Sequence, residues 1–533
     1  MARFFFYSCA IAALASCQSS PKAPTAEDIA AINLKKGDAI WCGPSEGNFG
    51  SVNFTVTGSP EIKKEFNLAM AMLHSFEYDE AEKAFAKIIE KEPTLAMAYW
   101  GVAMSNFHPL WTPSTEPELT KGAKAIEIAR SLSNKTKRET EYIEAIAHIY
   151  DNWKDTPHKE RYAKFEKAME AIHTAYPDDK EAAILYALAL NATADPTDKS
   201  YTNQKKAGGI LNKIYTNNPD HPGIVHYIIH NYDNPALAEL ALPAARKYAA
   251  IAPASAHAQH MPSHIFTRLG LWNEAVKSNL ASVSSAQCYA QSAGIQGHWD
   301  EELHGLDYLM YAYLQMGNNE LAKKQLDYLR SIDKVSDNNF KVAYSYAAIP
   351  ARYTMENRLW NEAASLDFYP ANFPWDKFPW QKAITHFARM MGKVHTNDIA
   401  GAGKELNELR TLQAILINQK DEYKAKQLEV QMKTGEAWIQ LKKGNKAEAL
   451  ALMTQAANLE DATEKHPVTP GEILPARELL GDMLMALQEP AKALEQYEAD
   501  MKRHPNRLNG RRGANLAAAR SGNAEKARQY AKL

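Results

Sequence analysis

The sequence predicts an all-α protein built as a solenoid of antiparallel helix pairs. A helix-pair pattern recurs along the chain at a period of about 34 residues. The second helix of each pair is rich in alanine, and alternation typical of a strand is confined to Gly50–Gly58. With 533 residues the chain is too long for one ordinary hydrophobic core, which an extended array of helix pairs avoids.

The first residues predict export from the cytoplasm. In "MARFFFYSCAIAALASC" one basic residue precedes an apolar stretch that is too short to span a membrane stably. The stretch ends in Leu14-Ala15-Ser16-Cys17, which resembles the bacterial lipobox and implies lipidation of Cys17. We therefore expect a signal peptide over 1–16, a tether over 17–35 and a lipid anchor in the bacterial cell envelope, at the outer membrane or periplasmic face. A plain signal peptide with a chance cysteine is the alternative.

An arm over 36–60 links the tether to the repeats. Val52, Phe54 and Val56 alternate with polar residues there, which fits a short strand or an extended arm. Cys42 in this arm and Cys288 are the two cysteines left once the export segment is set aside. An oxidising envelope permits a disulfide between them, but the sequence does not establish that they are close.

The repeats fall into an N-terminal solenoid over 61–330 and a C-terminal set over 331–533. In "LAMAMLHSFEYDEAEKAFAKIIEKEPTLAMAYWGVAMS", Leu68–Ser105, small residues, a tyrosine near the turn and a closing proline resemble the tetratricopeptide repeat (TPR). "LWNEA" occurs at Leu271–Ala275 and again at Leu359–Ala363. The stretches 107–121, 191–222 and 365–380 break the pattern. Those over 107–121 and 365–380 are rich in Pro, Trp and Phe, and we expect them to be loops packed over the solenoid.

Charge and motifs narrow the function. The 61 Lys and Arg against 63 Asp and Glu leave no positive excess for nucleic acid. No apolar stretch after the N-terminus is long enough to cross a membrane. The sequence also lacks G-x-S-x-G, H-E-x-x-H and phosphate-binding glycine-loop motifs. A concave groove that binds a protein, a peptide or a small ligand is the use to which such solenoids are suited.

Histidines cluster in the middle of the chain. His226 and His230 share one helix face, and His260 and His264 have the same spacing with a proline between them. His257 precedes that second pair. Imidazoles at this spacing are typical of helical metal sites for zinc, iron or copper. Two interpretations stay open: a metal or ligand site in the groove, or core histidines satisfied by hydrogen bonds.

Other residues join the candidate site from elsewhere in the chain. Asp233 and Glu301 are possible carboxylate ligands, with Glu302 as a further base or ligand. Thr469 and the residues after it predict the start of a helix that carries Arg477, which either faces the groove or forms a surface ion pair.

Several phrases resemble a family of bacterial TPR proteins: "AMLHSFEYDEAEKAF", "AHAQHMPSHIFTRLGLWNEA" and "HPVTPGEILPARELLGDML". The resemblance runs from near Gly50 to near Pro505. It implies the solenoid fold and places nine histidines in characteristic phrases, but it implies no activity. These are His74, His108, His226, His230, His257, His260, His264, His304 and His466.

Two functions follow from these observations. The first is an envelope-anchored scaffold whose groove binds a protein, peptide or small ligand, with a transition metal at the histidines. The second is a metal-dependent hydrolase or oxidoreductase that uses the same histidine and carboxylate pocket.

Overall fold

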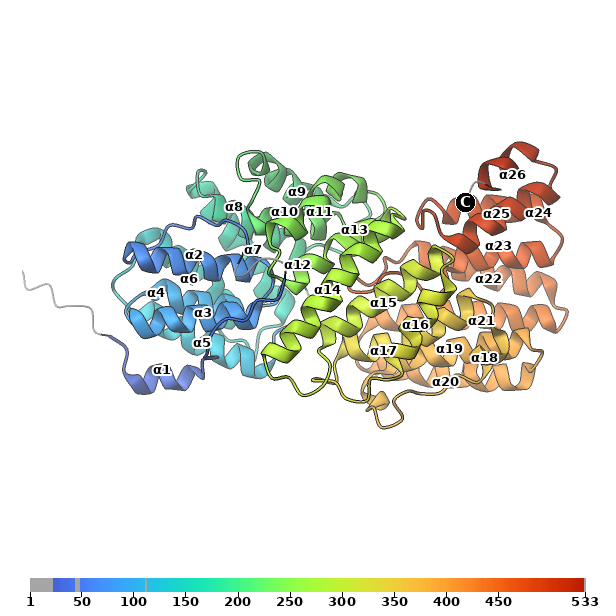
Figure 1. Cartoon of the computed structure of the whole chain (residues 1–533), viewed down its shortest axis with the longest axis horizontal. Helices are drawn as coiled ribbons and strands as arrows, with labels where there is room; N and C mark the ends of the chain where they lie inside the picture. The colour runs from blue at the N-terminus through green and yellow to red at the C-terminus, as the bar shows by residue number, and fades with distance from the viewer. Residues whose placement is uncertain (1–22, 44–47, 111–112, 532–533) are drawn as a thin grey trace, which may run out of the picture.

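The computed structural model describes residues 23–43, 48–110 and 113–531, and in this part of the chain it is all-α, with helices packed in pairs (Figure 1). The elements are α1 (Ala26–Ile32), α2 (Pro60–His74), α3 (Tyr78–Lys91), α4 (Ala96–Ser105), α5 (Glu116–Ser131), α6 (Lys137–Tyr150), α7 (His158–Ala175), α8 (Lys180–Ala192), α9 (Thr202–Tyr215), α10 (Pro222–Tyr232), α11 (Ala238–Ile251), α12 (Ala256–His260), α13 (Pro262–Arg268), α14 (Trp272–Ser292), α15 (Asp300–Gln315), α16 (Asn319–Leu329), α17 (Phe340–Glu356), α18 (Trp360–Ala364), η1 (Trp375–Lys377), α19 (Pro379–His395), α20 (Ile399–Asn418), α21 (Glu422–Lys442), α22 (Lys446–Asp461), α23 (Ala476–Ala486), α24 (Pro490–Asp500), α25 (Leu508–Arg520) and α26 (Ala524–Ala531). The prediction of a TPR-like helix-pair solenoid is confirmed.

Small residues let neighbouring helices approach closely, as the repeat pattern requires. Gly101 of α4 lies against the ring of Phe85 in α3, and a Cβ added to Gly101 would stand 2.4 Å from that ring. In the same way Gly481 of α23 lies under Tyr497 of α24, where an added Cβ would meet the ring at 2.7 Å. An alanine at either position would therefore push the two helices apart.

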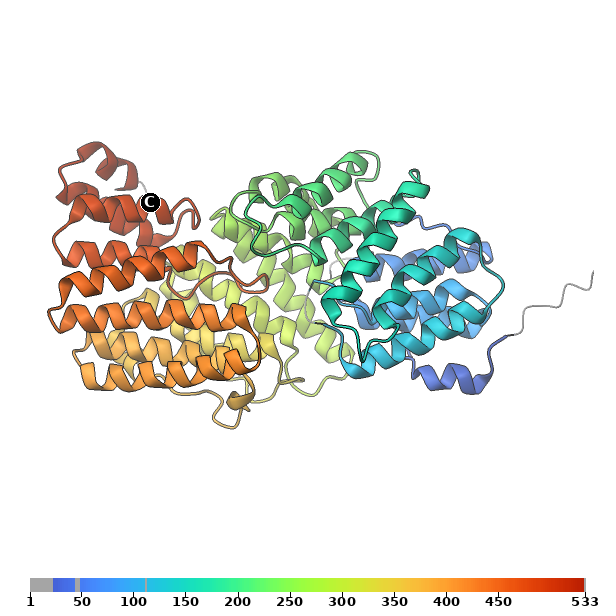
Figure 2. The same ribbon diagram turned by 180° about the vertical axis from the view of Figure 1, so that it is seen from behind.

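The apolar side chains form two cores along the array. One runs from Ile32 to Ala275 and also includes Tyr311 and Ala312 of α15, and the other runs from Leu303 to Ala518. The helices α14 and α15 lie where these cores meet, in the middle of the molecule (Figures 1 and 2).

The N-terminal arm is extended rather than part of a sheet. In the described ranges no strand is present, and Phe54 is buried with its backbone N–H donating to Asn67 Oδ1 at 2.7 Å. The arm also crosses the later helices, because the Cys42 N–H donates to the Ala254 carbonyl at 3.2 Å. Cys42 and Cys288 are joined as a disulfide with an Sγ–Sγ distance of 2.01 Å. The proximity that the sequence left open is therefore present.

Some expected irregular segments are helical. The helix α9 occupies much of 191–222, α5 begins inside 107–121, and α1 lies within the expected tether over 17–35. The break in the repeat pattern over 191–222 therefore contains a helix, because "TNQKKAGGILNKIY" buries Ala207, Gly208 and Leu211 on one face despite its glycines. The expectation of a helix start at Thr469 was also wrong, since α23 begins at Ala476.

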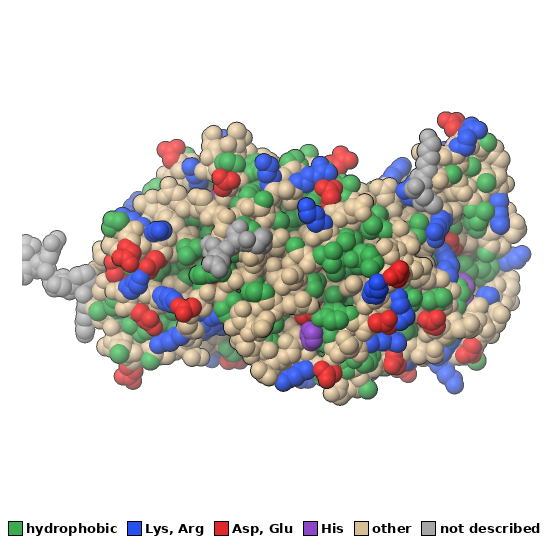
Figure 3. All heavy atoms as spheres, in the orientation of Figure 1, with side chains coloured by type: hydrophobic (Ala, Val, Ile, Leu, Met, Phe, Trp, Pro, Cys, Tyr) green, Lys and Arg blue, Asp and Glu red, His purple; other side chains and the backbone are tan. Residues whose placement is uncertain are grey.

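The segment 365–378 is a packed loop, as expected. Its Phe373 and Trp375 are buried, and the Phe373 ring lies 5.5 Å from that of Tyr346 in α17. The signal peptide, Cys17 and the first part of the tether fall outside the described residues. Among the helices of the described part, none is long and apolar enough to cross a membrane. On the face shown in Figure 3, basic and acidic side chains are interspersed and histidine is sparse.

Candidate metal centre

Six histidines converge in two groups in the middle of the molecule. His226, His230 and His257 form the first trio, and each offers one ring nitrogen within 4.8 Å of the others. The second trio meets the same criterion. It consists of His260, His264 and His304.

Four helices supply these side chains. The helix α10 carries His226 and His230 one turn apart, and α12 carries His257 and His260. Pro262 opens α13, which carries His264, and α15 carries His304. The short helix α12 therefore contributes one ligand to each trio. Its N-cap is Ser255, whose Oγ accepts from the Ala258 N–H at 3.0 Å and donates to Glu77 Oε1 at 2.6 Å.

In the second trio, partners fix the ring protons of two histidines. His264 Nδ1 donates to the Asp233 carboxylate at 3.1 Å, since a carboxylate can only accept. His260 Nδ1 donates to Asn279 Oδ1 at 2.7 Å, because the amide nitrogen of Asn279 is engaged with the Ala275 carbonyl. Each Nε2 then carries a lone pair and no proton, yet the two Nε2 atoms lie 3.1 Å apart. Neither nitrogen has a proton to share with the other.

The first trio is arranged similarly around His226. Its Nδ1 donates to the His74 carbonyl at 2.6 Å, so its Nε2 is also a lone pair. That Nε2 lies 3.2 Å from His257 Nε2 and 3.1 Å from His230 Nε2. Three ring nitrogens therefore point at one small volume.

Burial keeps the six imidazoles neutral. Burial, together with the charges of His74 and His264, lowers the pKa of His226 to about 3, although the bond to the His74 carbonyl acts in the opposite direction. Burial also lowers the pKa of each of the other five histidines. For His264, the hydrogen bond and the charge of Asp233 partly offset this decrease. For four of them, namely His230, His257, His260 and His304, the pKa lies well below the ordinary value. Neutral imidazole is the form that binds a metal ion.

A third group, His74, Glu181 and His221, has the spacing of a metal site but different chemistry. Glu181 accepts from His74 Nε2 and from His221 Nε2, both at 2.8 Å. The Tyr227 hydroxyl is hydrogen-bonded to His74 Nδ1 at 3.0 Å. Because a carboxylate already pairs both imidazoles, this group is held together by hydrogen bonds, and the His74 carbonyl beside it accepts from His226 Nδ1.

The carboxylates suggested by the sequence lie outside the two trios. Asp233 supports His264 and also pairs with Arg268 Nε at 2.8 Å and Lys465 Nζ at 3.2 Å. Glu301 pairs with Lys341 Nζ at 2.5 Å. Both trios therefore offer imidazole nitrogens alone, with Asp233 acting on a ligand rather than as one.

Glu302 is also engaged elsewhere. It accepts from His298 Nδ1 at 2.8 Å and from the Tyr328 hydroxyl at 2.6 Å. It belongs to a separate polar cluster at the start of α15.

Phe76 covers the first trio. Its ring centroid lies 4.3 Å from that of His226, 5.5 Å from His230 and 5.6 Å from His257. Its backbone has a φ of 57°, a left-handed conformation that costs a non-glycine residue roughly 1–2 kcal/mol. A glycine would fit this turn between α2 and α3 with less strain, but it would not shield the imidazoles.

The remaining predicted residues lie apart from the trios. His108 contacts the Ser105 carbonyl at 3.3 Å and the ring of Tyr78. Arg477 binds Asp461 at 2.6 Å and Gln496 at 2.6 Å. These two side chains are engaged locally.

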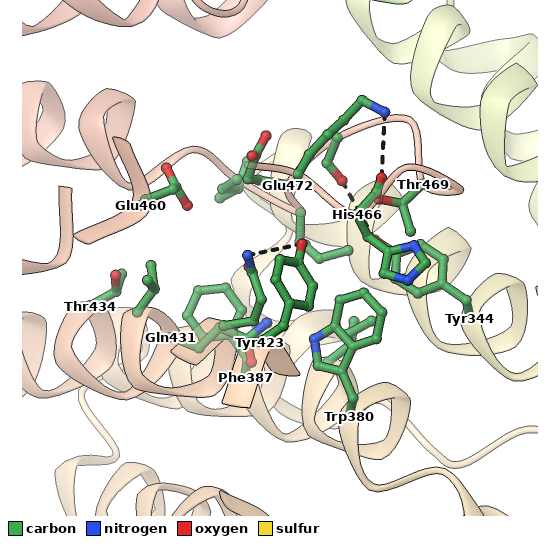
Figure 4. Close-up of a pocket in the computed structure, with 17 residues that line it drawn as sticks. Tyr344, Trp380, Phe387, Tyr423, Gln431, Thr434, Glu460, His466, Thr469 and Glu472 are labelled. Atoms are coloured by element: carbon green, nitrogen blue, oxygen red, sulfur yellow. Dashed lines mark hydrogen bonds between the residues drawn. The ribbon is translucent and has the colours of Figure 1, made fainter. Parts of the chain in front are cut away.

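His466 lines a cavity formed by α17, α19, α21 and the 463–475 loop (Figure 4). Aromatic rings of Phe340, Trp380 and Tyr423 surround it, at centroid distances of 4.7, 5.4 and 5.9 Å. The residue before it, Lys465, also lines the cavity and reaches Asp233. The cavity is thus linked to the second trio through a chain of two polar contacts.

Sequence reasoning missed the groups that orient the ligands. Asn279 lies 19 positions from His260, to which it is hydrogen-bonded, and Phe76 lies more than 100 positions from the histidines that its ring covers. Both residues stand in ordinary repeat helices or turns. No spacing rule singles out such residues. The positive φ of Phe76 is visible only in the fold. The expected open groove is likewise absent at these histidines, which are buried except for the half-buried His230.

Comparisons with known proteins find only distant structural similarity. No family model matches the chain, and no curated protein matches it. It is similar to the human IFIT1 dimer with m7Gppp-AAAA, with 13% identity, a TM-score of 0.36, and coverage of 89% of this chain and 90% of that one. It is also similar to the P58(IPK) TPR domain, with 11% identity, a TM-score of 0.21, and coverage of 87% and 99%. For Naa15/Naa10 bound to HypK-THB the identity is 12%, the TM-score 0.24, and the coverage 87% and 69%. By its own helix pairing the chain is a TPR-like repeat protein, distantly similar to these structures.

Proposed function

We propose that this protein binds transition-metal ions, one in each histidine trio, on a TPR-like scaffold. The observation that carries the proposal is the 3.1 Å approach of the Nε2 atoms of His260 and His264, both fixed as lone pairs. Two bare lone pairs repel. A proton between them would create a buried imidazolium, which the lowered pKa of both rings opposes. A metal ion between the two nitrogens would accept both lone pairs and remove the repulsion.

The distances fit an ion quantitatively. Nitrogens of histidine bind zinc at about 2.0–2.1 Å, so two of them in tetrahedral geometry lie about 3.3 Å apart. The three Nε2–Nε2 contacts in the trios measure 3.1, 3.1 and 3.2 Å. Asp233, Asn279 and the His74 carbonyl supply the outer acceptors that metal-binding histidines generally have.

Metal analysis of full-length protein purified without a histidine tag tests this proposal. After incubation with zinc or copper we expect two ions per chain, and one ion per chain for His230→Ala and for His264→Ala. His148→Ala, which alters a half-buried histidine of α6 away from the trios, should retain both ions. Far-UV circular dichroism checks that each variant is folded. Sub-stoichiometric metal in the wild type, unchanged in the two variants, would contradict the proposal.

A metal-dependent enzyme is the second candidate function. The cavity beside His466 favours it, because Lys465 joins that cavity to Asp233, which in turn supports His264. A small substrate in this cavity would lie near the second trio. If the cavity is the substrate site, Trp380→Ala should reduce turnover of a substrate found by screening while leaving the metal content unchanged.

The envelope location is a separate proposal, supported by the lipobox-like segment and by the disulfide, which is typical of exported proteins. Cys17→Ser should move the protein from the membrane fraction to the soluble fraction of the cell envelope. Retention of that variant in the membrane fraction would argue against lipidation at Cys17.

A further inference from the structure

We propose that the two trios form a single dinuclear copper centre that binds dioxygen between the ions. The inference rests on the proposed function, because it requires that both trios hold metal. It adds three claims: the two ions are close enough to share a ligand, they are copper, and the shared ligand is dioxygen.

The trios adjoin one another. His257 and His260 are three positions apart on α12, so one short helix fixes the separation of the two sites. Across the boundary, the rings of His230 and His264 have centroids 6.5 Å apart. That equals the 6.5 Å between His264 and His304 within the second trio. Ions held in the two trios would therefore be neighbours, as in two-metal sites, whose ions lie about 3.5–4 Å apart.

Charge selects the ion. The six ligands are neutral imidazoles, and two carboxylates suggested by the sequence are already paired with cations: Asp233 with Arg268 and Lys465, and Glu301 with Lys341. Because the cost of burying charge rises with its square, two divalent ions would cost about four times as much as two monovalent ions. Among the metals that imidazole binds well, copper has a stable monovalent form. Three imidazoles per ion also suit that form.

Dioxygen binding leaves the buried charge unchanged. Each of the two copper(I) ions gives up one electron, and the dioxygen molecule accepts both to become a bridging peroxide dianion. The pair of ions rises in charge by two while the ligand brings two negative charges. No proton is transferred and no further reactant is required. A centre built from neutral ligands is therefore suited to take up dioxygen in this way.

The surroundings fit such a centre. The ring of Phe76 lies over the first trio, and the ring of Tyr308 lies 4.7 Å from His260 and 5.3 Å from His264. These aromatic covers restrict water at both trios, which protects a reduced copper pair and its dioxygen adduct from side reactions.

The test uses full-length, untagged protein loaded with copper(I) under nitrogen in the presence of ascorbate and freed of excess copper and ascorbate. We expect two copper ions per chain. On admission of air, a strong near-ultraviolet charge-transfer band should appear, and it should fade when oxygen is removed. The oxygenated protein should give almost no copper(II) electron paramagnetic resonance signal, because two adjacent copper(II) ions couple their spins.

Variants separate this inference from the proposed function. His230→Gln and His264→Gln should each retain one copper ion and lose the band, whereas His148→Gln should keep both copper ions and the band. Two copper ions without a band, or with a resonance signal accounting for all the copper, would overturn the dinuclear inference while leaving metal binding intact. Failure of zinc and copper alike to bind would overturn both.

Discussion

Asn279 is not itself a metal ligand, but its hydrogen bond determines which ring nitrogen of the ligand His260 carries the proton. Its amide oxygen holds the Nδ1 proton of His260 at 2.7 Å, which turns Nε2 toward the second trio as a lone pair. Loss of such an outer acceptor typically lowers metal affinity 10- to 100-fold. We therefore expect Asn279→Ala to weaken the second-trio ion by about that factor, measured by competition with a chelator.

Asn231→Ala is the matched control. Asn231 is as buried as Asn279 and also donates to the carbonyl four residues earlier, that of Tyr227, but its Oδ1 serves no histidine. An equal loss of affinity in both variants would show that burial of the amide, rather than the bond to His260, is responsible.

Phe76 combines backbone strain with a covering ring. Phe76→Gly should relieve the left-handed turn, offsetting part of the roughly 3–5 kcal/mol that loss of a buried phenylalanine side chain costs. It should also open the first trio, so that a chelator removes the ion there at least several-fold faster. Stopped-flow extraction into a chromogenic chelator measures this rate.

Gln488→Gly provides the comparison, since Gln488 has a φ of 63° in the equivalent turn between α23 and α24. It should leave metal release unchanged. If Phe76→Gly releases metal no faster than Gln488→Gly, the ring is not the barrier.

At the scale of elements, α12 determines whether the two trios exist together. It has five residues, too few to be stable alone, and depends on the Ser255 cap and the bond from Ser255 to Glu77. Ser255→Ala should cost about 1 kcal/mol of stability and lower the metal occupancy of both trios. Metal analysis under limiting metal, with urea unfolding alongside, measures both effects.

The corresponding change at another helix is Ser59→Ala, which removes the N-cap of α2. It should lower the free energy of unfolding by a similar amount and leave the metal occupancy of both trios unchanged. A decrease in occupancy of the same size for both variants would mean that general destabilisation accounts for the effect.

The elements also show what the sequence could predict. Repeated patterns such as "LWNEA" gave the helix pairs, because burial of one helix face imposes a 3.6-residue period. His226 and His230 lie one turn apart on α10, whereas His260 ends α12 and His264 lies on α13, after Pro262. The third ligand of each trio comes from another helix, so His257 and His304 could be assigned to different trios only once tertiary packing was known. The helix over 202–215 is hidden in the sequence, because its glycines and lysines leave only a narrow buried face.

Across the whole molecule, the disulfide ties the N-terminal arm to α14. It spans 246 positions, so it removes much chain entropy from the unfolded state. Cys42→Ser with Cys288→Ser should lower the free energy of unfolding by roughly 2–5 kcal/mol. Urea unfolding with and without a reducing agent measures this. The double variant should not respond to the reducing agent, and an unchanged midpoint in the wild type would argue against the bond.

Acid should destabilise the molecule through buried neutral histidines outside the trios. Burial, with Arg358 and Lys442 nearby, lowers the pKa of His395 to about 4. The unfolded chain, with an ordinary value near 6.5, binds more protons between about pH 6.5 and 4. Stability is therefore present above pH 6.5 and is lost as the pH falls, by up to about 1.4 kcal/mol per unit from this residue.

Urea unfolding between pH 7 and 5 checks this sign. His395→Gln, whose side chain cannot be protonated, should flatten the pH dependence. His504 is the opposite case. Burial lowers its pKa, but Asp500 and Glu472 outweigh burial and raise this pKa well above the ordinary value. The stability that His504 contributes is therefore retained in acid. Identical pH profiles for the wild type and His395→Gln would contradict the prediction.

The position of the second trio has a consequence for folding. His260 and His264 lie among residues of the N-terminal core, whereas His304 lies on α15, whose apolar residues belong largely to the C-terminal core. An ion held by all three would fasten one half of the solenoid to the other. Repeat arrays otherwise tend to unfold piece by piece, because each unit contacts only its neighbours. With its ions in place, this chain would melt as one cooperative body, and without them its halves would come apart separately.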